Sequence, residues 1–322
     1  MIQGHGDDIY QYTGIRANFS SNIYAHQSHQ ALMDFLAAQP QLIDHYPEPE
    51  AWSLERLIAE RLSIEPANVI VTSGATEAIY LVAQTFPFRA VIPTPTFSEY
   101  ADACRMFGRE EGGESTMLWL CNPNNPTGEV YDQTYIDRMM AEHQLVVLDQ
   151  SYEHYTPQHV MSAQEGCRTA RCVQIHSMTK TYGVPGLRLG FITAHEQLTA
   201  RIREKLRPWT VSPLAIEAGK YLLAHDELIC RPDFDEAQRL RQRLQEIEGV
   251  EVMPTQTNFM LCRLTCGTAA ALKDYLARRH GLLIRDASNF EGLSPQHFRI
   301  AAQRPEENDA LVEGVKGMTN DK

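Results

Sequence analysis

Apolar runs alternate with stretches of helical spacing through the middle of the chain. Buried strands are predicted by the runs at 69–72, 90–93, 116–121 and 145–148. Each run is followed by a turn and then by positions with helical periodicity, and this order continues from about residue 69 to 190. It is typical of an α/β domain with a mainly parallel sheet and helices on both faces. Ligands of such domains bind at the carboxyl ends of the strands.

The two ends of the chain show other patterns. Residues 1–30 have no sustained periodicity, and we expect an extended arm there. Two helices are predicted by apolar spacing from 32 to 36 and from Ser53, with Ser53 as a capping residue. After Pro208, two helices lead to short strands near 250–253, 257–263, 282–285 and 297–302. We therefore divide the chain into an arm at 1–30, a large ligand-binding domain at 31–210 and a small α+β domain at 211–322.

The composition narrows the class of protein. The 322 residues are 43% hydrophobic and 22% charged, as in ordinary globular proteins. A net charge of −12 argues against nucleic acid or an anionic membrane as partner, so any anionic ligand must meet local arginines. There is no apolar run of ~20 residues and no leader pattern at the N-terminus. The seven scattered cysteines suit a reducing compartment, and we expect a cytoplasmic enzyme. His26 and His29 lack a second ligand pair, so we expect no metal site.

One stretch, from Ser177 to Gly190, carries candidate chemistry. Lys180 stands among hydroxyls, and Arg188 follows it after a loop that contains glycine and proline. A partly desolvated lysine on a rigid turn can form a Schiff base with an aldehyde. Ser177, Thr179 and Arg188 are suited to holding a phosphate. Pyridoxal phosphate (PLP) carries both an aldehyde and a phosphate. The alternative is structural, because most Ser/Thr-Lys pairs mark only a turn.

Three other motifs lie at predicted strand ends. The turn at 73–77 opens a helix and can present backbone N–H groups to a phosphate, or can be an ordinary capped turn. The segment 122–128 has three asparagines and two prolines, which predicts a fixed turn with amides at a strand end. Asp149 directly follows a buried strand and needs a partner, either a protonated pyridine nitrogen or a structural arginine.

Together, the segments 122–128, 149–152 and 177–190 resemble the fold-type I PLP enzymes, specifically class I/II aminotransferases. Within them, the chain looks most like the branch of histidinol-phosphate aminotransferase and threonine-phosphate decarboxylase. The resemblance covers most of the chain and implies the type I aminotransferase fold, PLP as cofactor and a homodimer with shared active sites. It implies that Lys180 is the Schiff-base lysine and proton shuttle, that Asp149 pairs with the pyridine nitrogen, and that Asn125 and Tyr152 bond the phenolic oxygen. The implied phosphate cup comprises Gly74, Ala75, Thr76, Ser177, Thr179 and Arg188.

The resemblance assigns five further residues. Tyr100 is placed like the aromatic that stacks on the cofactor ring, and Tyr46 like a tyrosine that reaches the other subunit's cofactor phosphate. Arg299 and Arg285 look like contacts to the substrate carboxylate or phosphate, with solvated surface arginines as the alternative. Asn22 stands where the family has an asparagine closely followed by proline. Only about fifteen residues separate Tyr100 from the strand at 116, where the family has a further strand and helix.

The resemblance leaves the reaction open. We favour transamination, which moves an amino group between an amino acid or phosphorylated amine and a keto acid, because it is the commonest reaction on this scaffold. The alternative is a lyase that decarboxylates an O-phosphorylated amino acid, which the segments 4–10, 19–22 and 285–290 resemble more. Both are reactions of amino-acid metabolism. A third possibility is a binding protein that retains PLP without turnover, against which the intact Lys180, Asp149, Tyr152 and Arg188 argue.

Overall fold

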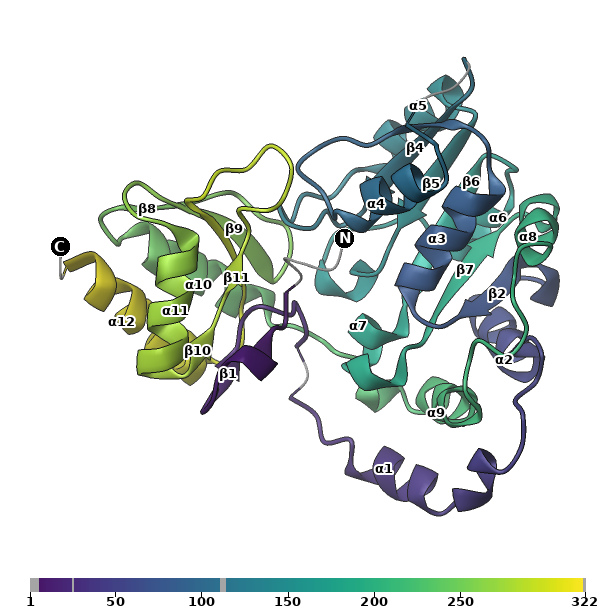
Figure 1. The fold of residues 1–322 in the computed structure, drawn as a ribbon, viewed down its shortest axis with the longest axis horizontal. Coiled ribbons are helices and arrows are strands. Elements are labelled where there is room, and N and C mark those ends of the chain that lie inside the picture. The colour runs from purple at the N-terminus through teal and green to yellow at the C-terminus, as the bar shows by residue number, and fades with distance from the viewer. Residues whose placement is uncertain (1–5, 25, 111–113, 321–322) are drawn as a thin grey trace.

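A six-stranded sheet forms the centre of the larger part of the molecule (Figure 1). The computed structural model describes residues 6–24, 26–110 and 114–320. The strands lie in the order β2-β7-β6-β5-β4-β3. Strand β7 runs opposite to the other five, which all point the same way. This confirms the predicted, mainly parallel sheet. The strands are β2 (Val69–Thr72), β3 (Arg89–Val91), β4 (Thr116–Cys121), β5 (Leu145–Asp149), β6 (Cys172–Ser177) and β7 (Gly190–Ala194).

Helices cover both faces of this sheet, which is why its strands read as continuous apolar runs. In β5, Leu145 and Val147 pack into the cluster under α3 (Ala75–Thr85), α4 (Glu99–Met106) and α8 (Glu196–Arg203). Val146 and Leu148 face the other way, toward α5 (Gln133–Glu142). The remaining helices of this part are α1 (Gln30–Ala37), α2 (Trp52–Leu62), α6 (Ala163–Cys167), α7 (Met178–Tyr182) and α9 (Pro213–Leu223).

A second, antiparallel sheet lies beside the first, in the order β11-β12-β9-β8 (Figure 1). Its strands are β8 (Val250–Val252), β9 (Phe259–Leu264), β11 (Arg285–Asp286) and β12 (His297–Ala301), and its helices are α10 (Phe234–Gln245), α11 (Ala269–His280) and α12 (Pro305–Asn320). The N-terminal arm belongs to this part, because β1 (Ala17–Asn18) pairs in parallel with β10 (Leu282–Leu283) and Phe19 enters the same core. Short 3-10 turns occur at Ile9–Gln11, Pro40–Ile43, Pro66–Asn68, Glu153–Tyr155, Pro185–Leu187 and Asp226–Leu228.

Two details refine the predictions. The domain limits 1–30, 31–210 and 211–322 stay a prediction, but α9 packs on α1 and α2, which favours a boundary after α9. The predicted serine cap of α2 is wrong. The helix begins at Trp52, and the Ser53 N–H donates to Glu48 Oε2 at 2.8 Å, so a preceding carboxylate takes the capping role.

Candidate active site

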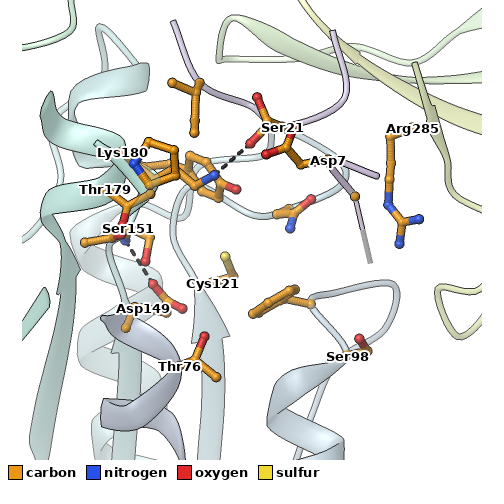
Figure 2. Close-up of a pocket in the computed structure, with 18 of the residues that line it drawn as sticks. Asp7, Ser21, Thr76, Ser98, Cys121, Asp149, Ser151, Thr179, Lys180 and Arg285 are labelled. Atoms are coloured by element: carbon orange, nitrogen blue, oxygen red, sulfur yellow. Dashed lines mark hydrogen bonds between the residues drawn. The ribbon is translucent and has the colours of Figure 1, made fainter. Parts of the chain in front are cut away.

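The carboxyl ends of β4, β5 and β6 border a cavity of about 360 Å³, a size that suits a small ligand. Side chains from the large sheet, the arm and the second sheet line it, so it lies where the two parts of the molecule meet (Figure 2). It brings together most of the predicted site residues: Ala75, Thr76, Tyr100, Asn125, Asp149, Tyr152, Ser177, Thr179, Lys180, Arg188, Arg285 and Arg299.

Lys180 extends into the cavity from α7, directly after β6 (Figure 2). Its Nζ donates to the Ser21 carbonyl at 2.7 Å and lies 5.5 Å from the centre of the Tyr152 ring. Burial, reinforced by the charges of Arg299 and Arg188, lowers the pKa of Lys180 to about 7. A large share of the amine is therefore neutral near pH 7, which makes it a nucleophile and a base.

Asp149 ends β5 and is buried at the cavity wall. Its Oδ2 accepts from the Tyr100 hydroxyl at 2.7 Å, and its Oδ1 accepts from the Ser151 N–H at 2.9 Å. Burial raises the pKa of Asp149, and these hydrogen bonds oppose the rise. Within the described ranges, no arginine or lysine lies at ion-pair distance from Asp149. The structural-arginine alternative therefore finds no support, and the carboxylate is open to a cationic group of a ligand.

A second wall of the cavity is an anion site. Helix α3 begins at Ala75, so its first N–H groups and the positive end of its dipole are at the cavity. Gly74 precedes it with φ +84°, and a Cβ at this position would lie 2.6 Å from Arg188 Nη2. Thr179 Oγ1 is buried and has no hydrogen-bond partner in the part of the chain that the structure describes. A helix start, a guanidinium and an unpaired hydroxyl together suit a phosphate.

Two buried arginines form the opposite side. Arg285 of β11 and Arg299 of β12 are directly paired in the sheet register, and Figure 2 shows Arg285 across the cavity from Lys180. Arg299 is 4% exposed and donates to Asn125 Oδ1 and to the Ser20 carbonyl. Burial lowers the pKa of Arg299 to about 10 and also lowers that of Arg285. The solvated-arginine alternative is therefore wrong for both residues, and two buried like charges favour an anionic ligand.

Tyr152 and Asn125 lie between these two walls. Tyr152 packs against Phe259 with ring centres 5.0 Å apart, and burial raises its pKa to about 12. The Asn125 amide oxygen is occupied by Arg299, which leaves its N–H groups for a ligand. Tyr152 and Asn125 thus offer hydrogen-bond donors at the centre of the cavity.

Three predicted residues do not line the cavity. Gly74 lies next to the Arg188 guanidinium and leaves room for it, because a side chain at this position would clash with Arg188. Asn22 is fully buried next to the lining residues Ser21 and Ile23. The nitrogen and oxygen of its side-chain amide form no hydrogen bond with the described residues. Tyr46 is 84% exposed and lies elsewhere on the surface.

The sequence did not single out several lining residues. Phe97 is partly exposed at the cavity, whereas the Tyr100 ring is fully buried, stacks on Trp119 at 5.4 Å and has its hydroxyl bound to Asp149. Phe97 is thus better placed than Tyr100 to cover a ligand ring, and the Pro93-Thr94-Pro95 turn before it was the available signal. The other lining residues outside the predicted set are Gly6, Asp7, Ser20, Ser21, Ile23, Ser98, Cys121, Ser151, Pro185 and Phe290. Five of these, Gly6, Asp7, Ser20, Ser21 and Phe290, stand in the segments that resemble decarboxylases. Gly4 and His5, which belong to the segment 4–10 that resembles decarboxylases, lie outside the described residues.

This arrangement fits PLP. The anion site matches a phosphate, the buried Asp149 matches a protonated ring nitrogen, and Lys180 offers a neutral amine to an aldehyde. Arg285 and Arg299 lie on the opposite side of the cavity from this anion site.

Comparison with known proteins agrees with this geometry. The family model of aminotransferase class I and II matches residues 15–111 and 109–315. The crystal structure of L-threonine-O-3-phosphate decarboxylase from Porphyromonas gingivalis is 35% identical and superposes with a TM-score of 0.89 over 94% of this chain and 99% of that one. Threonine-phosphate decarboxylase from Salmonella typhimurium is 27% identical over 90% of this chain and 86% of its own length. Histidinol-phosphate aminotransferase from Thermoanaerobacter sp. is 27% identical over 86% of this chain and 85% of its own length.

Proposed function

This chain belongs to the PLP-dependent class I and II aminotransferase family, and we propose that it transfers the amino group of a small phosphorylated amine or amino acid to a keto acid. The observation that carries the substrate class is the buried pair Arg285 and Arg299, which faces the cavity in addition to the phosphate-binding wall at Arg188. The wall at Arg188 holds the cofactor phosphate, and the arginine pair on the opposite side of the cavity binds anionic groups of the substrate.

The chain's own residues have distinct roles in this proposal. PLP, when bound, withdraws electrons from the substrate α-carbon, so that a bond to this carbon can break. Asp149 would keep the ring nitrogen protonated, and Asn125 and Tyr152 would donate hydrogen bonds to the phenolic oxygen. Lys180 Nζ accepts the α-proton and returns it, for which a pKa of about 7 is suitable. Arg299 orients the substrate by a charge-assisted hydrogen-bonded pair.

Decarboxylation of an O-phosphorylated amino acid is the second candidate. The observation in its favour is the 35% identity to the Porphyromonas gingivalis decarboxylase over nearly the whole of both chains. The two reactions differ in the bond that breaks at the α-carbon, either to hydrogen or to the carboxylate carbon. The placement of the substrate's anions on Arg285 and Arg299 therefore selects the reaction.

One assay distinguishes these functions. Purified protein with PLP is incubated with histidinol phosphate, threonine phosphate or common amino acids, with 2-oxoglutarate as acceptor, and both the carbonyl product and CO₂ are measured. Transamination gives a carbonyl product and glutamate, whereas decarboxylation gives CO₂ without acceptor consumption. Equal turnover of substrates with and without phosphate would refute the substrate class, and spectral change without any product would indicate a binding protein.

The matched variants are Arg299→Gln and Arg138→Gln. Arg299 is buried at the cavity, whereas Arg138 is an exposed arginine on α5. We expect Arg299→Gln to raise KM by about tenfold or more, because a charged hydrogen bond contributes about 1.5–3 kcal/mol. Arg138→Gln is expected to leave KM unchanged.

We also propose that the enzyme is a cytoplasmic homodimer with shared sites. Tyr46 lies outside the cavity of its own chain, and Figure 1 places the segment between α1 and α2 at the lower edge of the molecule. Exposed apolar side chains surround this segment in sequence: Met33, Ile43, Trp52 and Leu57. Such a face suits burial against a second copy. The seven free thiols suit a reducing compartment. Among the described residues, no helix has the length and apolar character of a membrane span.

Subunit mixing tests the shared site. We combine Lys180→Ala chains with Tyr46→Phe chains after confirming that each variant alone has lost most of its activity. A mixed dimer contains one site in which both residues are wild type, so activity is expected to return. Confirmed subunit exchange without recovered activity would place the whole site within one chain.

A further inference from the structure

Trp209 has a backbone conformation that is unfavourable for a bulky side chain. Its φ is +63°, in the left-handed region, and its side chain is 50% exposed. Among the described residues, the other non-glycine positions with positive φ are Asp7, Asn22, Arg188 and Ser63. The first three lie at or beside the cavity, and Ser63 is the C-cap of α2. In this molecule, positive φ angles at non-glycine residues thus occur mostly beside the cavity. Because backbone strain is typical of functional positions, we expect a functional role for Trp209.

Trp209 contacts the loop that carries Tyr46. The two rings lie with their centres 5.3 Å apart and their planes tilted by 41°. The backbone N–H of Trp209 donates to the Pro49 carbonyl at 2.9 Å, and Arg203 of α8 forms an ion pair with Glu50. The end of α8 thus holds Glu50 and the α8–α9 connection holds Pro49, while the Trp209 indole lies against the Tyr46 phenol.

The exposure of Tyr46 and Trp209 is unfavourable in a single chain. Tyr46 is 84% exposed, yet the indole beside it restricts the conformations that its ring can adopt. Restricting an exposed side chain costs conformational entropy, and this cost adds to the backbone strain at Trp209. Both costs are offset if the phenol is held ready for a binding partner, since a preorganised group loses less entropy on binding.

We propose that Trp209 is a positioning residue, which holds Tyr46 so that its hydroxyl reaches the phosphate-binding residues of a second copy of this chain. The inference rests on the shared site of the proposed function. It adds that the α8–α9 connection of one subunit sets the cofactor affinity of the other.

The experiment measures the dissociation constant of PLP, the probe, by titrating each dimeric protein, with the dimer confirmed by sedimentation. Trp209→Ala is expected to raise this constant about tenfold, as does Tyr46→Phe, because both lose a hydrogen bond to a charged group. Trp209→Phe keeps an aromatic face and is expected to retain wild-type affinity. The matched control is Met106→Ala, which removes an exposed apolar side chain at the end of α4 that does not belong to the proposed dimer face.

The double variant separates positioning from general support of the fold. In the Tyr46→Phe background, Trp209→Ala is expected to change the PLP dissociation constant less than twofold, because the hydroxyl that it positions is absent. A full tenfold loss in that background would overturn the proposal, as would wild-type affinity of dimeric Trp209→Ala. If Trp209→Ala does not fold or dimerise, Trp209→Leu replaces it. Leucine lacks an aromatic face, so equal affinities of the Leu and Phe variants would also overturn the proposal.

These outcomes are distinct from those of the proposed function, since PLP affinity is measured and not product. An unchanged affinity in Tyr46→Phe would overturn the shared site and this inference together. A loss in Tyr46→Phe with none in Trp209→Ala would overturn this inference alone. A wrong substrate class would alter neither measurement.

Discussion

Replacing Lys180 by methionine tests the electrostatics of the cavity in the cofactor-free protein. The substitution keeps an unbranched side chain that is one atom shorter, and it removes the amine. Burial and the neighbouring arginines lower the pKa of Lys180 from its ordinary 10.5 to about 7. A difference of this size corresponds to about 5 kcal/mol between the two protonation states. Because the side chain is only partly buried, solvent reduces the effect, and we expect about 2–4 kcal/mol.

The sign of the pH dependence follows from proton binding. Below about pH 7 the amine is protonated in both the folded and the unfolded chain, so the folded state bears the full cost of the buried charge. Between about 7 and 10.5 the unfolded chain binds more protons, and the free energy of unfolding rises with pH. Lys180→Met is therefore expected to be more stable than wild type at pH 6, and this advantage is expected to disappear as the pH approaches 10.5. The lost hydrogen bond to Ser21 subtracts about 1 kcal/mol at all pH values.

The assay is urea unfolding of both apoproteins at equal concentration at pH 6, 7.5, 9 and 10, followed by circular dichroism and by fluorescence. Lys205→Met, in which an exposed lysine after α8 is replaced, is the matched control and is expected to give a constant difference from wild type. A difference between Lys180→Met and wild type that stays within about 1 kcal/mol from pH 6 to 10 would refute a lowered pKa at Lys180.

Two further substitutions test the cofactor-binding residues. Asp149→Ala is expected to fold, to bind PLP more weakly and to lower turnover by about 10²–10³, because one strong electrostatic contact is lost; near-normal turnover would mean that the ring nitrogen has another partner. Gly74→Ala places a Cβ 2.6 Å from Arg188 Nη2 at φ +84°, so we expect PLP affinity to fall by about tenfold or more, a change of about 1.4 kcal/mol or above. Gly186→Ala, where a Cβ meets nothing within 4 Å, is its control and is expected to bind PLP normally; equal affinities of the two variants would contradict the phosphate wall.

The parts of the fold that local pattern determines could be predicted. The strand at 116–121 and the position of Asp149 at a strand end follow from apolar runs and the polar residues after them. The cap of α2 could not, because Glu48 reaches the helix start from five residues upstream while Ser53 looks like the cap. Phe97 was missed because the sequence does not show that Trp119 and Asp149 already occupy the ring and the hydroxyl of Tyr100.

Residues contributed by the arm were the least predictable part of the site. Asp7, Ser20 and Ser21 stand in the segments 4–10 and 19–22, whose resemblance to decarboxylases says nothing of their place in the fold. They reach the cavity because β1 pairs with β10, some 265 residues later in the chain. That pairing places backbone carbonyls of the arm on two of the cationic side chains of the site, Ser21 on Lys180 and Ser20 on Arg299. Long-range pairing of two-residue strands leaves almost no periodic signal.

The charge of the chain gives these arm contacts a meaning. A protein with a net charge of −12 concentrates Lys180, Arg188, Arg285 and Arg299 around one cavity, with Asp7 and Asp149 as the acidic lining residues. Carbonyl oxygens stabilise a cation through partial charge alone, so they hold Lys180 and Arg299 in place without neutralising them. Burial is the main cause of the lowered pKa values of Lys180 and Arg299, and the positive field of the neighbouring arginines adds to it. This field favours ligands that carry two anionic groups, because each anion relieves the repulsion between cations that the fold brings together.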